Sequence, residues 1–293
     1  MPGPQRHRLG PARERWCHGP IDLVVAAWGE ADAVEAAFGA AWARFGGVLD
    51  ALVAELALLR RPVTPTTEAH GPVARRMVAA CRAHLPAFVT PMAAVAGAVA
   101  EDVLEHFVRD GVARALVNNG GDIALHLAPG QVLRVGIVPD PRVPAVGGCV
   151  AVAHEDAVRG IATSGWRGRS FSLGIADSVT VLARTAAAAD AAATLIANAV
   201  NVEHPAVQRA PASSLKDDSD LGERLVTTAV GALPARLVET ALVRGLEAAE
   251  RQVACGNVIG AALALQGQWR ATAAAGGRIG GIGSASGPSA RAA

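Results

Sequence analysis

Apolar residues recur at helical spacing through much of the first third of the chain. Residues 31–59 are rich in alanine and carry acidic side chains near their start, where negative charge suits the positive end of a helix dipole. Prolines end this segment, and a second helix is predicted over residues 72–84. A third helix is predicted to begin at Pro91, because proline is favoured at the first helical position, and to run to Val108.

The pattern changes to short apolar runs in the middle of the chain, which indicates strands. A first strand is expected earlier, at residues 21–28. The later elements are predicted as strands at 113–117, 123–127, 132–138, 148–153 and 178–182, a helix at 185–200, a polar loop at 205–222 and a helix at 234–254. Because the strands cluster in the middle with helices on both sides, we predict an α+β fold rather than regular βαβ alternation.

Composition divides the chain into a lead, a folded domain and a tail. Residues 1–19 are basic and are interpreted as a flexible or strand-forming lead, and the folded domain is expected over residues 20–262. The segment 263–293 ends in a stretch rich in Gly, Ser and Ala, which is predicted to be disordered.

Charge and residue usage exclude several functions. Of the 293 residues, 51% are hydrophobic and 18% charged, so the chain can bury a large core. Its formal charge of +1 lacks the basic excess of proteins that bind nucleic acid, and we expect no such partner. Lys216 is the only lysine, which excludes a Walker A loop and disfavours a Schiff base. A phosphate would therefore have to meet arginine, a helix N-terminus or a metal.

The cysteines and the N-terminal segment favour a cytoplasmic location. The four cysteines form no CxxC pair, so a zinc knuckle or a thioredoxin-like motif is excluded, and buried thiols in a reducing compartment are expected. No clean apolar segment follows the basic N-terminus, and no charge-free apolar run reaches the roughly 18 residues of a membrane helix. We expect a soluble protein without a membrane partner, and a homo-oligomer could form because alanine-rich helices can pack flat against one another.

Two glycine-bearing segments could bind a ligand. Between two predicted strands, the paired glycines of Asn118-Asn119-Gly120-Gly121-Asp122 would let backbone N–H groups approach a ligand closely, although the same residues are the ordinary choice for a tight hairpin turn. The segment 160–170 combines hydroxyl groups with arginines that could hold phosphate, or it is a polar surface loop. Its candidate residues are Thr163, Ser164, Gly165, Arg167 and Arg169.

A third candidate is a polar stripe on an apolar helix. Steps of four place Asp190, Thr194 and Asn198 on one stripe among neighbours that are nearly all Ala, Leu, Ile or Val. If this helix is buried, the carboxylate needs a partner such as Mg²⁺ or an arginine, and Thr194 could add a second oxygen. If the stripe faces water, the same spacing follows without a ligand.

Other catalytic arrangements have little support in the sequence. The eight histidines show no HExxH pair, and Ser164 does not lie in a GxSxG elbow. Glu101 and Asp102 are interpreted as a solvated patch on the helix that follows Pro91.

Taken in order, these segments resemble the ApbE superfamily of FAD-binding proteins, whose best-known members are Mg²⁺-dependent flavin transferases. The resemblance lies in residues 95–99, 119–123, 162–165, 178–181 and 189–194. Further segments, at 19–23, 90–92, 168–170 and 174–178, are similar to an ApbE-like family of bacteria and archaea. The resemblance implies a T-fold-related α+β domain with a central, mostly antiparallel sheet and packed helices.

The resemblance also implies a binding site for FAD, or a related nucleotide, and Mg²⁺. Asp190 and Thr194 match the superfamily's metal-binding pair, which a backbone carbonyl would complete. Residues Asn119, Gly120, Gly121 and Asp122 match its flavin-nucleotide loop, and Thr163, Ser164 and Gly165 match a second ligand-facing turn, with Arg169 following as a candidate cation.

The chain also departs from the transferase pattern. Transferases carry a Lys-Gly pair in the helix before the glycine turn, where this chain has Ala96-Gly97. Residues 169–177 lack the His, Pro and Thr-Gly of the transferase motif. No catalytic residue is assigned, and Asp177 is the one carboxylate that could stand in.

Three functions are therefore compatible with the sequence. The first is a cytoplasmic ApbE-like protein that binds FAD or a related nucleotide with Mg²⁺ and could act at a pyrophosphate. The second is a genuine FMN transferase with a rearranged site. The third is a non-catalytic binding or assembly protein that keeps only the scaffold.

Overall fold

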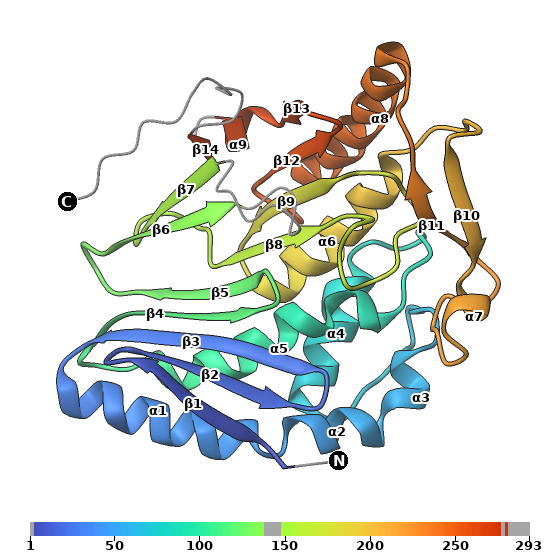
Figure 1. Ribbon diagram of the computed structural model, residues 1–293. Coiled ribbons are helices and arrows are strands. Elements are labelled where there is room, and N and C mark those ends of the chain that lie inside the picture. The colour runs from blue at the N-terminus through green and yellow to red at the C-terminus, as the bar shows by residue number, and fades with distance from the viewer. Residues whose placement is uncertain (1–2, 138–147, 277–278, 281–293) are drawn as a thin grey trace.

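A computed structural model describes residues 3–137, 148–276 and 279–280, and its centre is one long antiparallel sheet (Figure 1). Nine strands lie side by side in the order β1-β2-β3-β4-β5-β8-β9-β12-β13, and every pairing between neighbours is antiparallel. Their bounds are β1 Gln5–Gly10, β2 Arg13–His18, β3 Ile21–Gly29, β4 Val112–Asn119, β5 Asp122–Leu127, β8 Gly160–Ser164, β9 Ser178–Ala183, β12 Gly260–Leu265 and β13 Gln268–Ala271. The predicted α+β class and the antiparallel sheet are confirmed.

Two smaller sheets flank the long one. One has the order β14-β7-β6, with β6 Val132–Ile137, β7 Gly148–Ala153 and β14 Ile279–Gly280. The other is a ribbon of β10 (Val207–Pro211) and β11 (Leu225–Val230), which are joined through the short helix α7 (Ala212–Leu215). Aliphatic side chains of β6 and β7 pack with those of β5 and β8 in one buried cluster, so this small sheet covers one face of the long sheet.

Helices cover the opposite face of the long sheet. The helical elements on this face are α1 Ala31–Phe45, α2 Val48–Ala54, α3 Leu56–Leu59, α4 Pro72–Arg82, η1 Pro91–Ala94, α5 Val95–Leu104, η2 Glu105–Phe107, α6 Ala186–Ala199 and α8 Ala235–Ala254. The short helix α9 (Ala273–Gly276) instead packs through Ala275 on the side of the small sheet. Alternate residues of β5 show how the two layers divide. Ala124 packs with α5 and α6, whereas Ile123 and Leu125 pack with β6 and β7.

Most predicted elements are present, but residues 31–59 do not form one helix. The segment is divided at Gly46-Gly47 and again at Glu55 into three helices. Glycine is unfavourable in a helix interior because it loses the most backbone freedom, so a pair of glycines is a natural break. The predicted helices near Pro72, Pro91, Ala186 and Ala235 are found within a few residues of their expected bounds.

The strand β12 was not predicted, because it is buried on both faces and therefore lacks the alternating pattern of a half-buried strand. The lead, interpreted as flexible or strand-forming, forms the largely exposed edge strand β1 and the strand β2. The predicted polar loop at 205–222 contains β10 and α7, and residues 160–164 form β8 instead of part of a loop.

The expected boundaries at residues 19 and 262 do not coincide with an edge of the sheet. β1 and β2 are paired with β3 in the long sheet, and β12 runs across position 262. Most of the expected disordered tail lies outside the described residues.

One apolar stretch among the described residues, Ala31–Ala54, has the length and composition of a membrane helix. It contains the break at Gly46-Gly47, and its side chains Phe38 and Phe45 are buried against Trp16 in the core. It is therefore a part of the folded core. The expected cytoplasmic location stays a prediction.

The pair Glu101-Asp102 is not a solvated patch. Asp102 is buried and accepts hydrogen bonds from Arg44 (2.7 Å) and Arg76 (3.1 Å). Glu101 accepts a hydrogen bond of 2.8 Å from the Ala187 N–H in the first turn of α6. These carboxylates therefore hold α1, α4 and α6 to α5. Their partners are far apart in the sequence, so the sequence alone could not show this role.

Candidate functional site

The predicted ligand-facing residues gather around one cavity of about 580 Å³ between the long sheet and strand β6. Six of the eight residues predicted to bind the cofactor line it: Gly120, Gly121, Thr163, Ser164, Gly165 and Arg169. The other two, Asn119 and Asp122, do not line it. The turn between β4 and β5 and the end of β8 therefore meet, as the resemblance implied.

The β4–β5 connection is both a tight hairpin turn and a wall of the cavity. Asn119 and Asp122 are paired across it, and Gly120 and Gly121 have φ values of 68° and 115°, which residues with a side chain rarely adopt. The Gly121 N–H donates to the Asn118 side-chain oxygen at 2.8 Å. Both interpretations of this turn are thus compatible with one structure.

Arg169 lies against the turn at the mouth of the cavity. Its guanidinium is so close to Gly120 that a Cβ there would collide with it. The side chain is exposed, and it makes no hydrogen bond or ion pair with any described residue. Arg169 can therefore offer its guanidinium to an anion at the mouth.

Asp177 also lines the cavity, but its carboxylate is held by protein groups. It accepts hydrogen bonds from Arg167 Nε at 2.9 Å, from the Trp166 ring N–H at 3.3 Å and from the Gln266 N–H at 2.6 Å. The ion pair with Arg167 fixes the loop that carries Arg169. Asp177 is thus placed where a catalytic carboxylate would be useful, and it also has a structural role.

Asp122 points from the turn toward the helical layer, away from its neighbour Ile123, which lines the cavity. Its Oδ1 accepts a hydrogen bond of 3.3 Å from the Thr163 N–H. Burial raises the pKa of Asp122 to about 7, and the Thr163 N–H and the positive charge of Arg169 oppose that rise.

Asp190 is buried in α6 at 9% exposure, and its Oδ2 accepts a hydrogen bond of 3.0 Å from the Gly97 N–H at the start of α5. Burial and, second, the nearby Asp122 carboxylate raise the pKa of Asp190 well above its ordinary value. Close by, Asn119 donates to the Ala96 carbonyl at 3.2 Å. The half-buried carboxylate of Asp122 and the buried carboxylate of Asp190 therefore share the space beneath the glycine turn.

The three polar residues of the stripe on α6 have different roles. Asn198 accepts hydrogen bonds from the Leu173 N–H (2.9 Å) and the Ser172 hydroxyl (3.3 Å), so it holds the loop before β9. Thr194 is half-buried, and its hydroxyl has no hydrogen-bond partner among the described residues. Only Asp190 and Thr194 remain as oxygen donors from this helix.

The donor set suits a cation that binds few protein side chains. In the described part of the chain, no group of three His, Cys, Asp or Glu side chains is arranged to hold a metal. Mg²⁺ commonly binds one or two carboxylates and completes its shell with water and substrate phosphates. Asp190, Asp122 and the Thr194 hydroxyl therefore fit Mg²⁺ better than zinc, which takes four protein ligands in structural sites and about three in catalytic ones.

Several lining residues were missed by the sequence interpretation. They are the aliphatic side chains Ile123, Ile161, Val135 and Ile137 and the hydroxyl residues Ser178 and Thr180. A signal was present in Ser178-Val179-Thr180-Val181, where hydroxyl and aliphatic side chains alternate along the strand. That alternation shows a polar face, but it does not show what the face meets.

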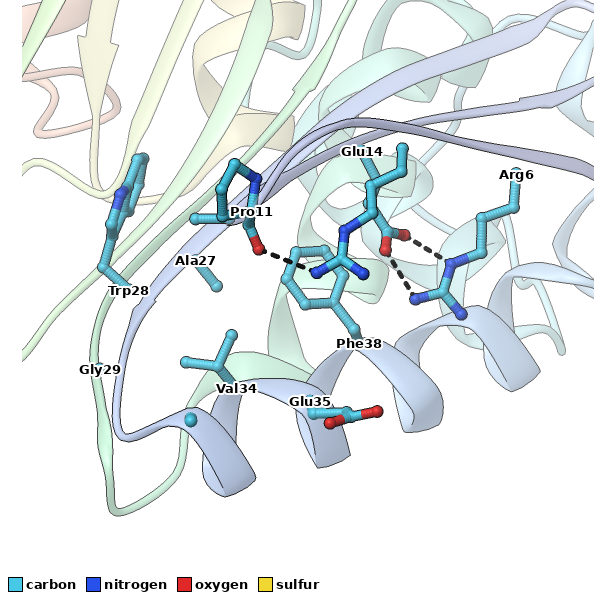
Figure 2. Close-up of a pocket in the computed structure, with 12 residues that line it drawn as sticks. Arg6, Pro11, Glu14, Ala27, Trp28, Gly29, Val34, Glu35 and Phe38 are labelled. Carbon is cyan, nitrogen blue, oxygen red and sulfur yellow. Dashed lines mark hydrogen bonds and ion pairs between the residues drawn. The ribbon is translucent and has the colours of Figure 1, made fainter.

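A second cavity, of about 530 Å³, lies between the β1–β2 hairpin and α1 (Figure 2), and none of the predicted site residues lines it. Arg6 is held there by Glu14 through hydrogen bonds of 2.5 and 2.8 Å, and Arg8 donates to the Pro11 carbonyl at 3.3 Å. Its arginines thus have partners within the protein.

The long antiparallel sheet with helices on one face and a small sheet on the other defines an ApbE-like fold. The structure is similar to the crystal structure of the Pseudomonas stutzeri flavinyl transferase ApbE in its apo form, with a TM-score of 0.53 and 13% identity. The similarity covers 96% of this chain and 99% of that one. The chain belongs to the family described as AbpE bacteria, whose model matches residues 5–271.

Archaeal proteins named UPF0280 protein are relatives of this chain. The one from Methanothermobacter thermautotrophicus is 40% identical over 139 residues, which is 47% of this chain and 52% of the relative. The one from Methanosphaerula palustris is 38% identical over 156 residues, 52% of this chain and 63% of the relative. The chain thus spans between half and two thirds of the length of these relatives.

Proposed function

We propose that the protein binds FAD or a related nucleotide in the cavity beside the β4–β5 turn, and Mg²⁺ at the carboxylates behind that turn, on its helical side. One observation carries the proposal. The turn and the end of β8 line one cavity, and two neighbouring carboxylates, the half-buried Asp122 and the buried Asp190, lie behind the turn. Two like charges in a buried space favour either a shared proton or a bound cation.

The residues around the cavity have distinct roles in this proposal. The guanidinium of Arg169 binds the pyrophosphate, because it makes no hydrogen bond or ion pair with a described residue, and the glycine turn lets the phosphate approach the backbone closely. Asp190 and Thr194 hold Mg²⁺, with Asp122 as a further carboxylate. When bound, the ion neutralises negative charge that develops on a pyrophosphate oxygen.

The chemistry we favour is action at the pyrophosphate without FMN transfer. The transferase lysine is replaced by Ala96, and the Gly97 N–H is occupied by Asp190. FMN transfer is the second candidate, because Asp177 lies at the cavity wall where it could activate an acceptor hydroxyl. Incubation with FAD, Mg²⁺ and a threonine-bearing acceptor protein distinguishes the two, since only a transferase leaves FMN covalently attached.

The test of binding is a calorimetric titration of the protein with FAD, with and without Mg²⁺. We expect affinity that depends on Mg²⁺. Asp190→Asn keeps an acceptor for the Gly97 N–H but removes the charge, so its affinity in the presence of Mg²⁺ should fall by about tenfold or more. Asp50→Asn is the control, because that residue is exposed on α2 and does not line the cavity.

Two results would count against the proposal. If neither FAD nor another nucleotide binds in the presence of Mg²⁺, the ligand site is wrong. If Asp190→Asn binds as the unmodified protein does, the metal role is wrong, and a non-catalytic binding or assembly protein becomes the better description. A cytoplasmic location remains part of the proposal, supported by the four free cysteines.

A further inference from the structure

Ser178 carries a buried hydroxyl with no partner. Only four buried side-chain polar atoms in the described part of the chain lack a hydrogen bond, and they belong to His18, Arg44, His84 and Ser178. Ser178 alone among them lines the cavity of the candidate site. Its residue is 2% exposed, at the start of β9. The unpartnered hydroxyl is therefore part of the cavity floor.

The neighbouring hydroxyls do have partners. Thr180, two residues along the same strand and on the same face, is paired with Thr163 of β8, and their hydroxyl oxygens are 3.0 Å apart. The row Ser178, Thr180 and Thr163 thus forms a polar strip on the cavity floor, in which the end member, Ser178, is the one hydroxyl that makes no hydrogen bond with a described residue.

The remaining walls of the inner cavity are aliphatic and come from two facing sheets. Ile123 and Ile161 are registered neighbours on β5 and β8, and Val135 and Ile137 come from β6 of the small sheet. A slot between two aliphatic walls suits a flat, apolar-faced group. A polar strip along one side of the slot suits a group whose edge carries hydrogen-bonding atoms.

We infer that this slot holds a planar heterocycle of the bound nucleotide and that Ser178 determines specificity by hydrogen bonding to the polar edge of that ring. The inference rests on the proposed function, because it gives a binding place to the ring of the same nucleotide whose pyrophosphate is proposed to bind Arg169. Both a flavin ring and an adenine have flat faces and a polar edge, so the shared chemistry is the heterocycle itself.

The energetic argument favours a ligand over a structural role. A buried hydroxyl without a hydrogen bond destabilises the folded state, and alanine at this position would remove that penalty. A residue that lowers stability where a smaller one would fit is expected mainly at functional sites. The Ser178 hydroxyl is therefore expected to form its hydrogen bond with a bound ligand.

The experiment uses Ser178→Ala and three probes, each titrated in the presence of Mg²⁺: FAD, FMN and ADP. Loss of one neutral hydrogen bond should weaken FAD binding by about 3- to 10-fold. Weakening that is shared by FMN but not by ADP places the flavin in the slot. Weakening that is shared by ADP but not by FMN places the adenine there, and either result supports the inference.

A matched control separates specificity from stability. Ser172 is also buried, but its hydroxyl donates to Asn198 and accepts from the Gly174 N–H. Ser172→Ala should lower the unfolding temperature and leave the relative affinities of the three probes unchanged. Ser178→Ala should leave the unfolding temperature of the unliganded protein unchanged or raise it.

Two outcomes overturn the inference while leaving the proposed function intact. They are unchanged affinity of Ser178→Ala for every probe that the unmodified protein binds, and a lower unfolding temperature of the unliganded variant, which would reveal a structural partner. If the unmodified protein binds none of the three probes, the proposed function fails and the inference fails with it.

Discussion

At the scale of single residues, the neighbouring carboxylates of Asp122 and Asp190 are the strongest indication that the protein binds a cation. Asp122 accepts a hydrogen bond from the Thr163 N–H, and Asp190 accepts hydrogen bonds from the backbone N–H groups of Gly97 and Ala96, but so few hydrogen bonds do not offset the desolvation of a full charge. Because two like charges close together resist joint ionisation, the pair without a cation should retain a proton near neutral pH. A cation would release that proton.

The raised pKa of Asp122 predicts how stability depends on pH. The folded-state pKa of about 7 exceeds the ordinary value of 3.8, so the folded state holds its proton more tightly than the unfolded state. This contribution to stability is fully present below the unfolded-state pKa of 3.8 and is lost as pH rises through the folded-state pKa of about 7. Asp122→Asn keeps an acceptor for Thr163 and cannot ionise, so its stability relative to the unmodified protein should increase with pH.

Urea unfolding of both proteins without metal, at about pH 5 and about pH 8, measures this effect. The advantage of Asp122→Asn should be larger at the higher pH by about 2 to 4 kcal/mol. The buried His84 and the half-buried His126, whose pKa values are lowered by burial, titrate in both proteins, so their contributions cancel in the difference. An advantage that is equal at the two pH values would show that Asp122 is not the titrating group.

At the scale of elements, the small side chains of the alanine-rich helix α6 allow it to pack closely against α5. Most of its alanines are buried inside the chain, and Gly97 of α5 lies so near the Ala186 carbonyl that any side chain would collide with it. This approach places Asp190 within hydrogen-bond distance of the Gly97 N–H. These alanines are used within the chain, and a homo-oligomer stays a prediction that would need another surface.

A pair of glycine substitutions tests the close packing of α5 and α6. Gly97→Ala should lower the free energy of unfolding by about 2 kcal/mol or more, because the added methyl meets backbone atoms of α6 that cannot move separately. Gly39→Ala, in the interior of α1 with open space around it, should raise it by about 0.5 to 1 kcal/mol. Chemical denaturation measures both, and similar effects at the two positions would contradict the packing described for Gly97.

At the scale of the whole molecule, the long sheet joins segments that are far apart in the chain. The candidate site depends on β4, β5, β8 and β9, which are neighbours in the middle of that sheet, and β6 covers them from one side (Figure 1). The N-terminal hairpin extends the same sheet, and its Trp16 is fully buried among aromatic side chains of α1. The first residues are thus part of the core.

Removal of residues 1–19 tests that integration. The shortened chain loses β1, β2 and the buried Trp16 ring, and β3 becomes an unprotected edge. The lost tryptophan contacts alone should reduce the free energy of unfolding by about 3 to 5 kcal/mol. Thermal unfolding and size-exclusion chromatography measure the effect, and an unchanged unfolding temperature would show that the lead is separable from the domain.

The sequence predicted elements best where local signals are strong. Pro72 and Pro91 correctly indicated the starts of their helices, and the glycine pair 120–121 correctly indicated the hairpin. Signals failed where burial is symmetrical, as in β12, because a strand with two similar faces has no period of two. Among the site residues, the glycine turn and Asp190 were apparent, whereas Ser178 lay within segments that carry the resemblance but was not identified as a site residue.

By itself, the sequence determined the class of fold, the segments that carry glycine and hydroxyl groups, and the presence of a carboxylate in an apolar helix, because these depend on residue types and short spacings. Only the tertiary structure decided which of these groups share a space. It placed Asp122 beside Asp190, separated Asn198 from them, and left the Ser178 hydroxyl without a partner in an aliphatic slot. The physical reason is that burial and pairing depend on neighbours supplied by distant parts of the chain.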